Sequence, residues 1–75
     1  MEAQEMFEEL RYEFSEDEYE KIYSKKLNVE DTDYTLKVIG FNKNCKTIDV
    51  SIGNGVLTLN ELKAINQQCK ELGWL

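Results

Sequence analysis

The sequence predicts an α+β fold, a two-layer sandwich of a three-stranded antiparallel meander with two helices on one face. Three observations support this prediction: apolar residues recur at helical spacing near both ends, β-branched and aromatic stretches fill the middle, and short polar segments separate them. The predicted order of elements is α-β-β-β-α. Because 75 residues suffice for only one hydrophobic core, we expect a single domain over residues 1–75.

The first element is an amphipathic helix predicted over residues 2–10. Ala3, Met6, Phe7 and Leu10 follow the i, i+3, i+4, i+7 spacing of one apolar helix face. Glutamates fill the other faces, and the early ones suit the positive end of the helix dipole. Since so short a helix is marginal by itself, it must dock on the rest of the protein.

Three strands are predicted next, at about 18–26, 33–41 and 45–52. The polar segments 28–33 and 42–44 connect them as short links, which favours an antiparallel meander. In the third strand, apolar and polar residues alternate as a half-buried strand requires: Ile48, Val50 and Ile52 against Thr47, Asp49 and Ser51. The sheet face away from the helices is predicted to carry Tyr23, Lys25, Lys37, Thr47 and Ser51.

Glycines at 53 and 55 are predicted to end the sheet, and the sequence marks both ends of a last helix after them. Thr58 as N-cap and Glu61 three residues later predict a capping box. Gly73 predicts a left-handed C-terminal cap, with Trp74 folding back on Cys69. The predicted core stripe of this helix is Leu59, Leu62, Ile65, Cys69 and Leu72.

Charge is distributed unevenly along the chain. Residues 1–20 hold nine of the fifteen acidic residues and one basic residue, so their net charge is −8, and the remaining residues carry +2. Direct nucleic-acid binding is disfavoured, because phosphate contacts need a basic surface. A protein partner with a basic surface is favoured instead.

The sequence lacks the residues that several kinds of catalytic, metal-binding and phosphate-binding site require. There is no histidine, which removes Ser-His and Cys-His nucleophile systems and histidine metal sites. The cysteines Cys45 and Cys69 form no CxxC motif, and the glycines form no phosphate-binding loop. Asp31 and Asp33 lack the glycine and the distal glutamate of a calcium loop. We therefore expect no enzymatic activity, no cofactor and no metal.

The sequence favours a cytoplasmic protein. No apolar run approaches the roughly 20 residues of a membrane span, so no membrane association is expected. The acidic start MEAQEMFEEL lacks the basic region of a signal peptide. Two cysteines in so short a chain fit a reducing compartment better than a disulfide framework.

The candidate binding surface is the acidic end. Glu2, Glu5 and Glu9 fall at i, i+3 and i+7, and steps of about 5–6 Å approximate the distance between adjacent phosphates along a nucleic-acid strand. This spacing suggests a nucleic-acid mimic anchored by nearby aromatic residues, and a solvated acidic face is the alternative. The predicted partner-binding residues are Glu2, Glu5, Glu9, Glu13, Glu16, Asp17, Glu18, Glu20, Tyr12 and Tyr19.

The stretches AQEMFEEL, YSKK and TLNELKAINQQCKELGWL resemble small proteins encoded in phages and prophages of Firmicutes. The resemblance implies a phage origin and the cytoplasm of a host bacterium, but it assigns no functional residues. Size, acidity and element order are similar in kind to acidic anti-CRISPR proteins, which occupy nucleic-acid-binding surfaces of their effectors. Arg11 departs from the pattern, because a glycine is expected where the first helix ends.

Two functions follow from these observations. The first is a non-enzymatic, phage-encoded binding protein whose acidic end docks on a basic surface of a host or phage protein, as an inhibitor of a nucleic-acid-binding defence enzyme such as a CRISPR effector. The second is a structural or assembly adaptor, or a homodimer, that uses the edge strands or the exposed sheet face without nucleic-acid mimicry. Both are compatible with a monomer or a weak homodimer.

Overall fold

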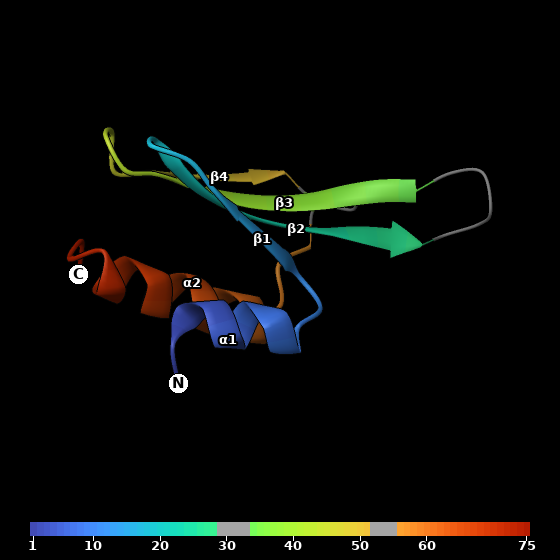
Figure 1. Cartoon of the computed structure of the whole chain (residues 1–75). Coiled ribbons are helices and arrows are strands. Elements are labelled where there is room, and N and C mark those ends of the chain that lie inside the picture. Colours follow the sequence, from blue (N-terminus) through green and yellow to red (C-terminus); the bar gives the residue numbers. More distant parts are fainter. Residues whose placement is uncertain (29–33, 52–55) are drawn as a thin grey trace.

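The computed structural model describes residues 1–28, 34–51 and 56–75. Along the chain the elements are α1 (Ala3–Glu9), β1 (Glu13–Glu16), β2 (Glu20–Asn28), β3 (Tyr34–Asn42), β4 (Thr47–Ser51) and α2 (Leu59–Glu71). The strands form one antiparallel sheet in the order β1-β2-β3-β4, which confirms the α+β class (Figure 1). The predicted features at residues 29–33, with Asp31 and Asp33, and at residues 52–55 lie outside the described residues.

Within the described residues the sheet has four strands, so the prediction of three is wrong, and the additional strand is β1. β1 pairs with β2 and places Phe14 opposite Tyr23, with 5.0 Å between the ring centroids. Asp17 closes the hairpin, because its Oδ1 accepts hydrogen bonds from the backbone N–H groups of Tyr19 and Glu20. Two of the four β1 residues are glutamates, which are poor strand formers, so propensity gave no signal for this strand.

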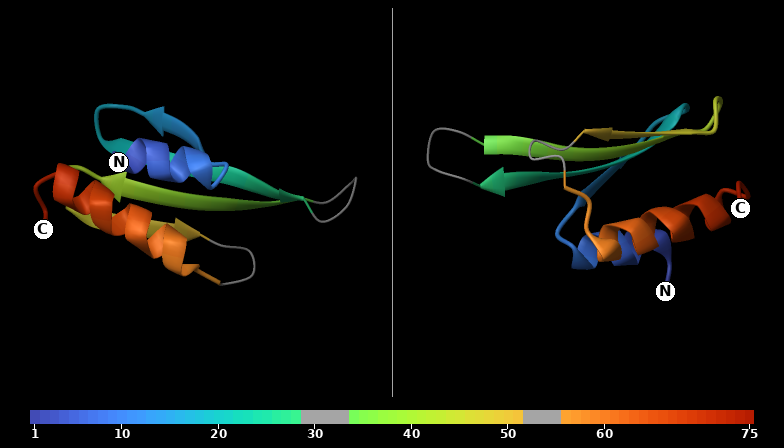
Figure 2. Two further views of the ribbon diagram at one scale, coloured as in Figure 1. Left: turned by 90° about the horizontal axis from the view of Figure 1, so that it is seen from below. Right: turned by 180° about the vertical axis from the view of Figure 1, so that it is seen from behind.

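Both helices lie side by side on one face of the sheet, as predicted (Figures 1 and 2). The predicted apolar face of α1 is confirmed: Ala3 and Phe7 are fully buried, and Met6 and Leu10 pack against the core. Phe7 stacks on Tyr23 of the sheet, with 3.9 Å between the ring centroids. The buried core consists of Phe7, Tyr12, Tyr23, Ile39, Phe41, Ala64, Ile65 and Cys69.

Part of the predicted outer sheet face is in fact the helix-covered face. Tyr23 pairs with Ile39 across the sheet, and both are buried in the core. Side chains alternate along a strand, so Lys37 lies on this same face and is buried against α2. Lys25 also faces the helices, since its Nζ donates to the backbone carbonyl of Leu10. Thr47 and Ser51 are exposed.

The buried face of α2 differs from the predicted stripe. Leu59 and Leu62 are 66% and 51% exposed, so their assignment to the core is wrong. Ile65 and Cys69 are buried as predicted, and Leu72 is partly buried. The residues that face the sheet are Glu61, Ala64, Ile65, Gln68 and Cys69. The polar side chains of Glu61 and Gln68 are accommodated on this face because they have hydrogen-bond partners there. Lys37 and Tyr12 donate to Glu61, and Tyr23 donates to Gln68.

The ends of α2 follow the predicted signals. Thr58 Oγ1 accepts from the Glu61 backbone N–H at 3.1 Å, and Glu61 Oε1 accepts from the Thr58 N–H at 2.8 Å. At the other end Gly73 has φ 79°, and the Trp74 N–H donates to the Cys69 carbonyl at 2.8 Å. The capping box and the left-handed cap are therefore confirmed.

The end of α1 repeats this C-terminal motif without a glycine. Arg11 has φ 71°, and the Tyr12 N–H donates to the Phe7 carbonyl at 3.0 Å. Tyr12 thereby takes the position after α1 that Trp74 takes after α2. The left-handed conformation strains a residue that has a Cβ, so the chain accepts a local cost here.

Candidate functional site

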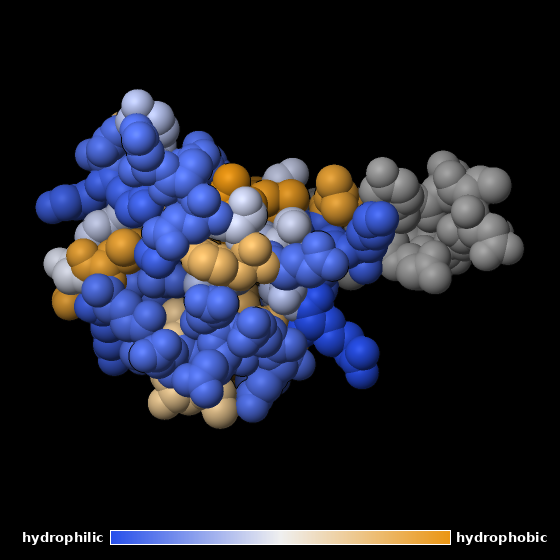
Figure 3. Space-filling model, in the orientation of Figure 1, coloured by the Kyte–Doolittle hydropathy of each residue, from blue (hydrophilic) through white to orange (hydrophobic). Residues whose placement is uncertain are grey.

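The outer face of α1 is acidic. Glu2, Glu5, Glu8 and Glu9 are all exposed, while Phe7 anchors the opposite face of the helix in the core. Glu5 also has a structural role, because its Oε1 accepts from the Glu2 backbone N–H at 3.1 Å. Figure 3 shows that hydrophilic residues dominate this side of the molecule.

Two predicted site residues at the β1–β2 hairpin are already occupied by other groups of the chain. Glu16 Oε2 lies 3.2 Å from Lys21 Nζ and 2.9 Å from Lys43 Nζ. The hydrogen bonds from Lys43 and Lys21 hold the pKa of Glu16 below its usual range. The backbone hydrogen bonds from Tyr19 and Glu20 likewise lower the pKa of Asp17. These two carboxylates organise the hairpin and do not extend the acidic face of α1.

The remaining predicted acids do not converge on α1. Glu13 pairs with Ser24 and lies on the sheet face away from the helices, because its neighbour Phe14 faces the core. Glu18 and Tyr19 are exposed at the tip of the hairpin, and Glu20 is partly buried. The structure therefore separates the nine predicted residues other than Tyr12 into an α1 group, a hairpin group and a residue on the outer sheet face.

Tyr12 does not belong to a binding surface. Its side chain is only 4% exposed, and its hydroxyl donates to the Glu61 carboxylate beneath α2. Burial, together with the neighbouring Glu61 carboxylate, raises the pKa of the Tyr12 phenol. The prediction that Tyr12 contacts a partner is wrong, because hydrophobic packing and this hydrogen bond hold the side chain in the core.

A buried polar network lies between α2 and the sheet, and the sequence prediction missed it. Lys37 Nζ lies 2.6 Å from each carboxylate oxygen of Glu61, and Tyr12 donates to the same carboxylate. Beside it, the Tyr23 hydroxyl donates to Gln68 Oε1 at 2.6 Å. Lys37 follows the same period of two as the buried residues Ile39 and Phe41, and that spacing was the signal that could have placed it inside.

The network keeps Glu61 ionised and the tyrosines neutral. Burial raises the pKa of Glu61, but the hydrogen bonds from Lys37, the Thr58 backbone and Tyr12 outweigh this and bring the pKa to about 2. Burial is the main cause that raises the pKa of Tyr23, and nearby carboxylates, first Glu71, add to it. Glu61 is 1% exposed, so its carboxylate is not accessible to a substrate. The network is an internal support of the fold.

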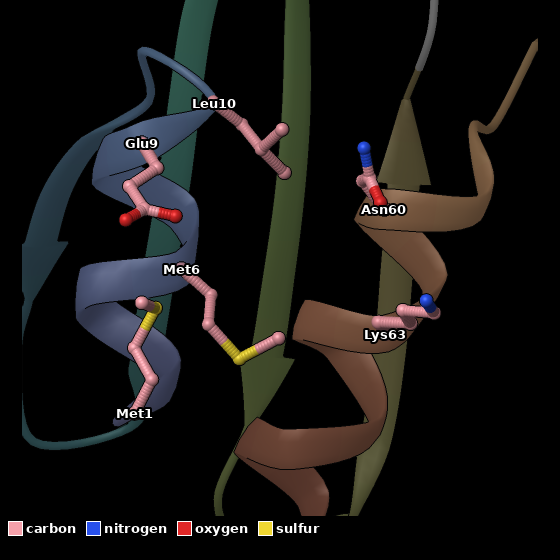
Figure 4. Close-up of a pocket in the computed structure, with 6 residues that line it drawn as sticks. All are labelled: Met1, Met6, Glu9, Leu10, Asn60 and Lys63. Atoms are coloured by element: carbon pink, nitrogen blue, oxygen red, sulfur yellow. The ribbon is translucent and has the colours of Figure 1, made fainter.

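A shallow pocket of about 200 Å³ lies between α1 and α2. In Figure 4, Met6 and Leu10 project toward α2. The lining residues are Met1, Met6, Glu9, Leu10, Asn60 and Lys63. Ligand sites usually span about 300–1,000 Å³ and enclose most of the ligand, so this open depression does not constitute one. Among the described residues, no group of three or more Cys, Asp or Glu side chains is arranged to hold a metal ion.

No helix within the described ranges is both long and apolar enough to cross a membrane. No family model, curated protein or solved structure matches this chain. The resemblance to small phage proteins therefore stays a prediction.

Proposed function

We propose that this chain is a non-enzymatic binding protein whose helix α1 docks on a basic surface of another protein. The observation that carries the proposal is the set of exposed carboxylates on α1: Glu2, Glu5, Glu8 and Glu9. None of the four takes part in an ion pair within the part of the chain that the structure describes. Glu16, by contrast, is neutralised by two lysines.

The arrangement of these carboxylates costs stability and therefore suggests a role outside folding. Glu5 lies three residues from Glu8 and four from Glu9, and like charges at these spacings destabilise a helix by about 0.2–0.5 kcal/mol per pair. Phe7 fixes the helix on the sheet, so the carboxylates are presented on a rigid surface. A basic partner relieves the repulsion and pays little entropy for ordering the helix.

The partner class that fits is a protein with a lysine- and arginine-rich nucleic-acid-binding surface. Residues three or four apart on one helix face have Cβ atoms about 5–6 Å apart, close to the spacing of phosphates on one strand. Charge complementarity of this kind mainly speeds association and selects partners. The resemblance to phage proteins makes a host defence enzyme, such as a CRISPR effector, the first member of the class to test.

The test compares two variants with the same change in net charge. The first carries Glu2→Gln, Glu8→Gln and Glu9→Gln on α1 and spares Glu5, which supports the start of the helix. The matched control neutralises three exposed acids elsewhere, with the substitutions Glu13→Gln, Glu18→Gln and Asp49→Asn. Circular dichroism first establishes that both variants are folded.

Binding is measured after capture of a partner from bacterial lysate, by titration of the purified partner at about 50 mM and about 200 mM salt. We expect the α1 variant to bind at least tenfold more weakly, the control to bind like wild type, and a duplex oligonucleotide to compete. Equal binding by both variants, or affinity that does not change with salt, would contradict the proposal.

A further inference from the structure

A second exposed surface of the molecule is apolar, and it lies where β4 and α2 meet the solvent. β4 is an edge strand, and every one of its residues is exposed. Exposed apolar side chains of β4, of α2 and of the segment that leads into α2 define the β4–α2 patch. Its members are Ile48, Val50, Val56, Leu57, Leu59 and Leu62, between 38% and 66% exposed.

Three members of the patch, Ile48 and Val50 of β4 and Leu62 of α2, share one side of the molecule. Ile48 pairs with Phe41, and Val50 pairs with Ile39, so both β4 side chains lie on the sheet face that carries the helices. On α2, Asn60 faces α1 across the shallow pocket. Leu62 follows two residues later, about 200° around the helix, and therefore projects away from α1. Figure 2 shows α2 under β4 and α1 under β1 and β2.

The exposed area of the patch matches that of a functional apolar patch. Its six members leave on the order of 500 Å² exposed, and the largest apolar patch of a soluble monomer is about 300–600 Å² and is often functional. A stable interface buries about 800 Å² on each partner, with an apolar centre and a polar rim. The patch supplies such a centre, and the exposed polar residue Asn66 beside Leu62 and Leu59 on α2 supplies part of a rim.

The charge distribution favours a second copy of this chain as the occupant. Three strand spacings of about 4.8 Å place the β1 edge about 14 Å from β4. In a two-fold dimer whose two sheets extend away from the contact, the two β1 edges are therefore about 28 Å apart, well beyond the screening length of about 8 Å at physiological salt. The acidic α1 helices lie on the outer sides of such a dimer, where the net charge of −6 per chain opposes association least.

We propose that the β4–α2 patch is the interface of a symmetric homodimer in which each α2 packs against its copy beside the two β4 edges. A two-fold axis brings the same apolar strand edge and helix flank together on both protomers, so the contact is self-complementary. This dimer does not depend on the proposed docking of α1, which lies on the other side of α2.

The test is sedimentation velocity across about 1–200 µM, with Leu62→Glu as the disrupting variant. Leu62 is half exposed, so this substitution spares the core, and Leu59→Glu is a second variant of the same kind. Leu75→Glu is the matched control, because Leu75 is exposed outside the patch. Circular dichroism and urea unfolding verify that each variant is folded.

We expect wild type and Leu75→Glu to approach twice the chain mass of 8.8 kDa as concentration rises. Leu62→Glu and Leu59→Glu should remain monomeric, with at least a tenfold weaker dimer. A wild-type chain that is monomeric at every concentration would assign the patch to another occupant and overturn the proposal. Dimerisation of Leu62→Glu with wild-type affinity would overturn it as well. Neither outcome depends on the α1 charge variants, so the two proposals are tested separately.

Discussion

Lys37 and Glu61 form an ion pair inside the protein, with the lysine Nζ 2.6 Å from both carboxylate oxygens. The pair joins β3 to the first turn of α2. The same carboxylate caps that turn through Thr58 and accepts the hydroxyl of Tyr12, which follows α1. One side chain thus connects the sheet, the second helix and the end of the first helix.

Breaking this pair from one side is expected to be costly. Lys37→Met leaves the Glu61 carboxylate buried without its cation, and removal of one partner of a buried pair costs about 3–5 kcal/mol. Urea unfolding followed by circular dichroism measures the change. Adding Glu61→Gln to Lys37→Met should recover part of the loss, because the uncompensated charge is then absent. A Lys37→Met variant as stable as wild type would show that the pair contributes nothing.

The exposed ion pairs of Glu16 should contribute far less stability than the buried pair of Lys37 and Glu61. Glu16→Gln removes the contacts with Lys21 and Lys43 at the surface, where solvent screens charge. The urea midpoint of this variant should therefore stay within experimental error of wild type. A shift as large as that of Lys37→Met would mean that burial does not decide the difference.

Acid should unfold the protein partly through Glu61. Its pKa is about 2 in the folded protein, below the value of about 4.3 in an unfolded chain. A lowered folded pKa stabilises the protein above the unfolded pKa, and this contribution disappears as the pH falls from about 4.5 to 2. It amounts to about 3 kcal/mol. Urea midpoints across this range measure it, and Glu61→Gln should show a flatter acid limb than wild type.

The buried tyrosines should destabilise the protein at alkaline pH. Burial raises the pKa values of Tyr12 and Tyr23 above that of an unfolded tyrosine, which is about 10. A phenol whose pKa is raised in the folded protein does not lower the free energy of unfolding at pH values below its unfolded pKa. As the pH rises above the unfolded pKa, the free energy of unfolding falls. Ultraviolet absorbance should therefore show two phenols that ionise only as the circular dichroism signal is lost. Tyr12→Phe should reduce that late step by one phenol, whereas ionisation of both phenols in the folded protein would contradict the prediction.

Arg11→Gly should stabilise the protein by about 1 kcal/mol. Arg11 occupies the left-handed region at φ 71°, where a side chain costs about 1–2 kcal/mol and glycine avoids this strain. The matched reverse change is Gly73→Ala at the end of α2, where φ is 79° and no atom lies within 4 Å of the added Cβ. It should destabilise by a similar amount, because strain and not a clash sets the cost. Thermal unfolding of both variants measures the two effects, and shifts of the same sign would contradict this account.

Local signals predicted most elements of the fold. Thr58 and Glu61 act within three residues, and the apolar spacing of α1 acts within two turns, so neither needs information from distant parts of the chain. Strand β1 was missed because its glutamates disfavour a strand. Its pairing depends on the contact of Phe14 with Tyr23 and on the turn at Asp17.

The candidate site was less predictable than the fold. The acidic face of α1 follows from helical spacing, and Glu2, Glu5 and Glu9 are exposed as that spacing requires. Glu16 was not recognisable as neutralised, because its lysine partners come from two other parts of the chain. Tyr12 was predicted to bind a partner because it lies next to the acidic residues in the sequence. In the structure its hydroxyl donates to Glu61, which lies forty-nine residues away in the chain.

The sequence by itself determined the two helices, both ends of α2, the strands β2, β3 and β4 and the acidic character of the first twenty residues, since these depend on neighbours a few residues apart. Only the tertiary structure decided which face of α2 is buried. Leu59 and Leu62 remain exposed because the face that meets the sheet offers Glu61 to Lys37 and Gln68 to Tyr23. A buried polar group must find its partner across the core, and that requirement is fixed by packing between distant segments.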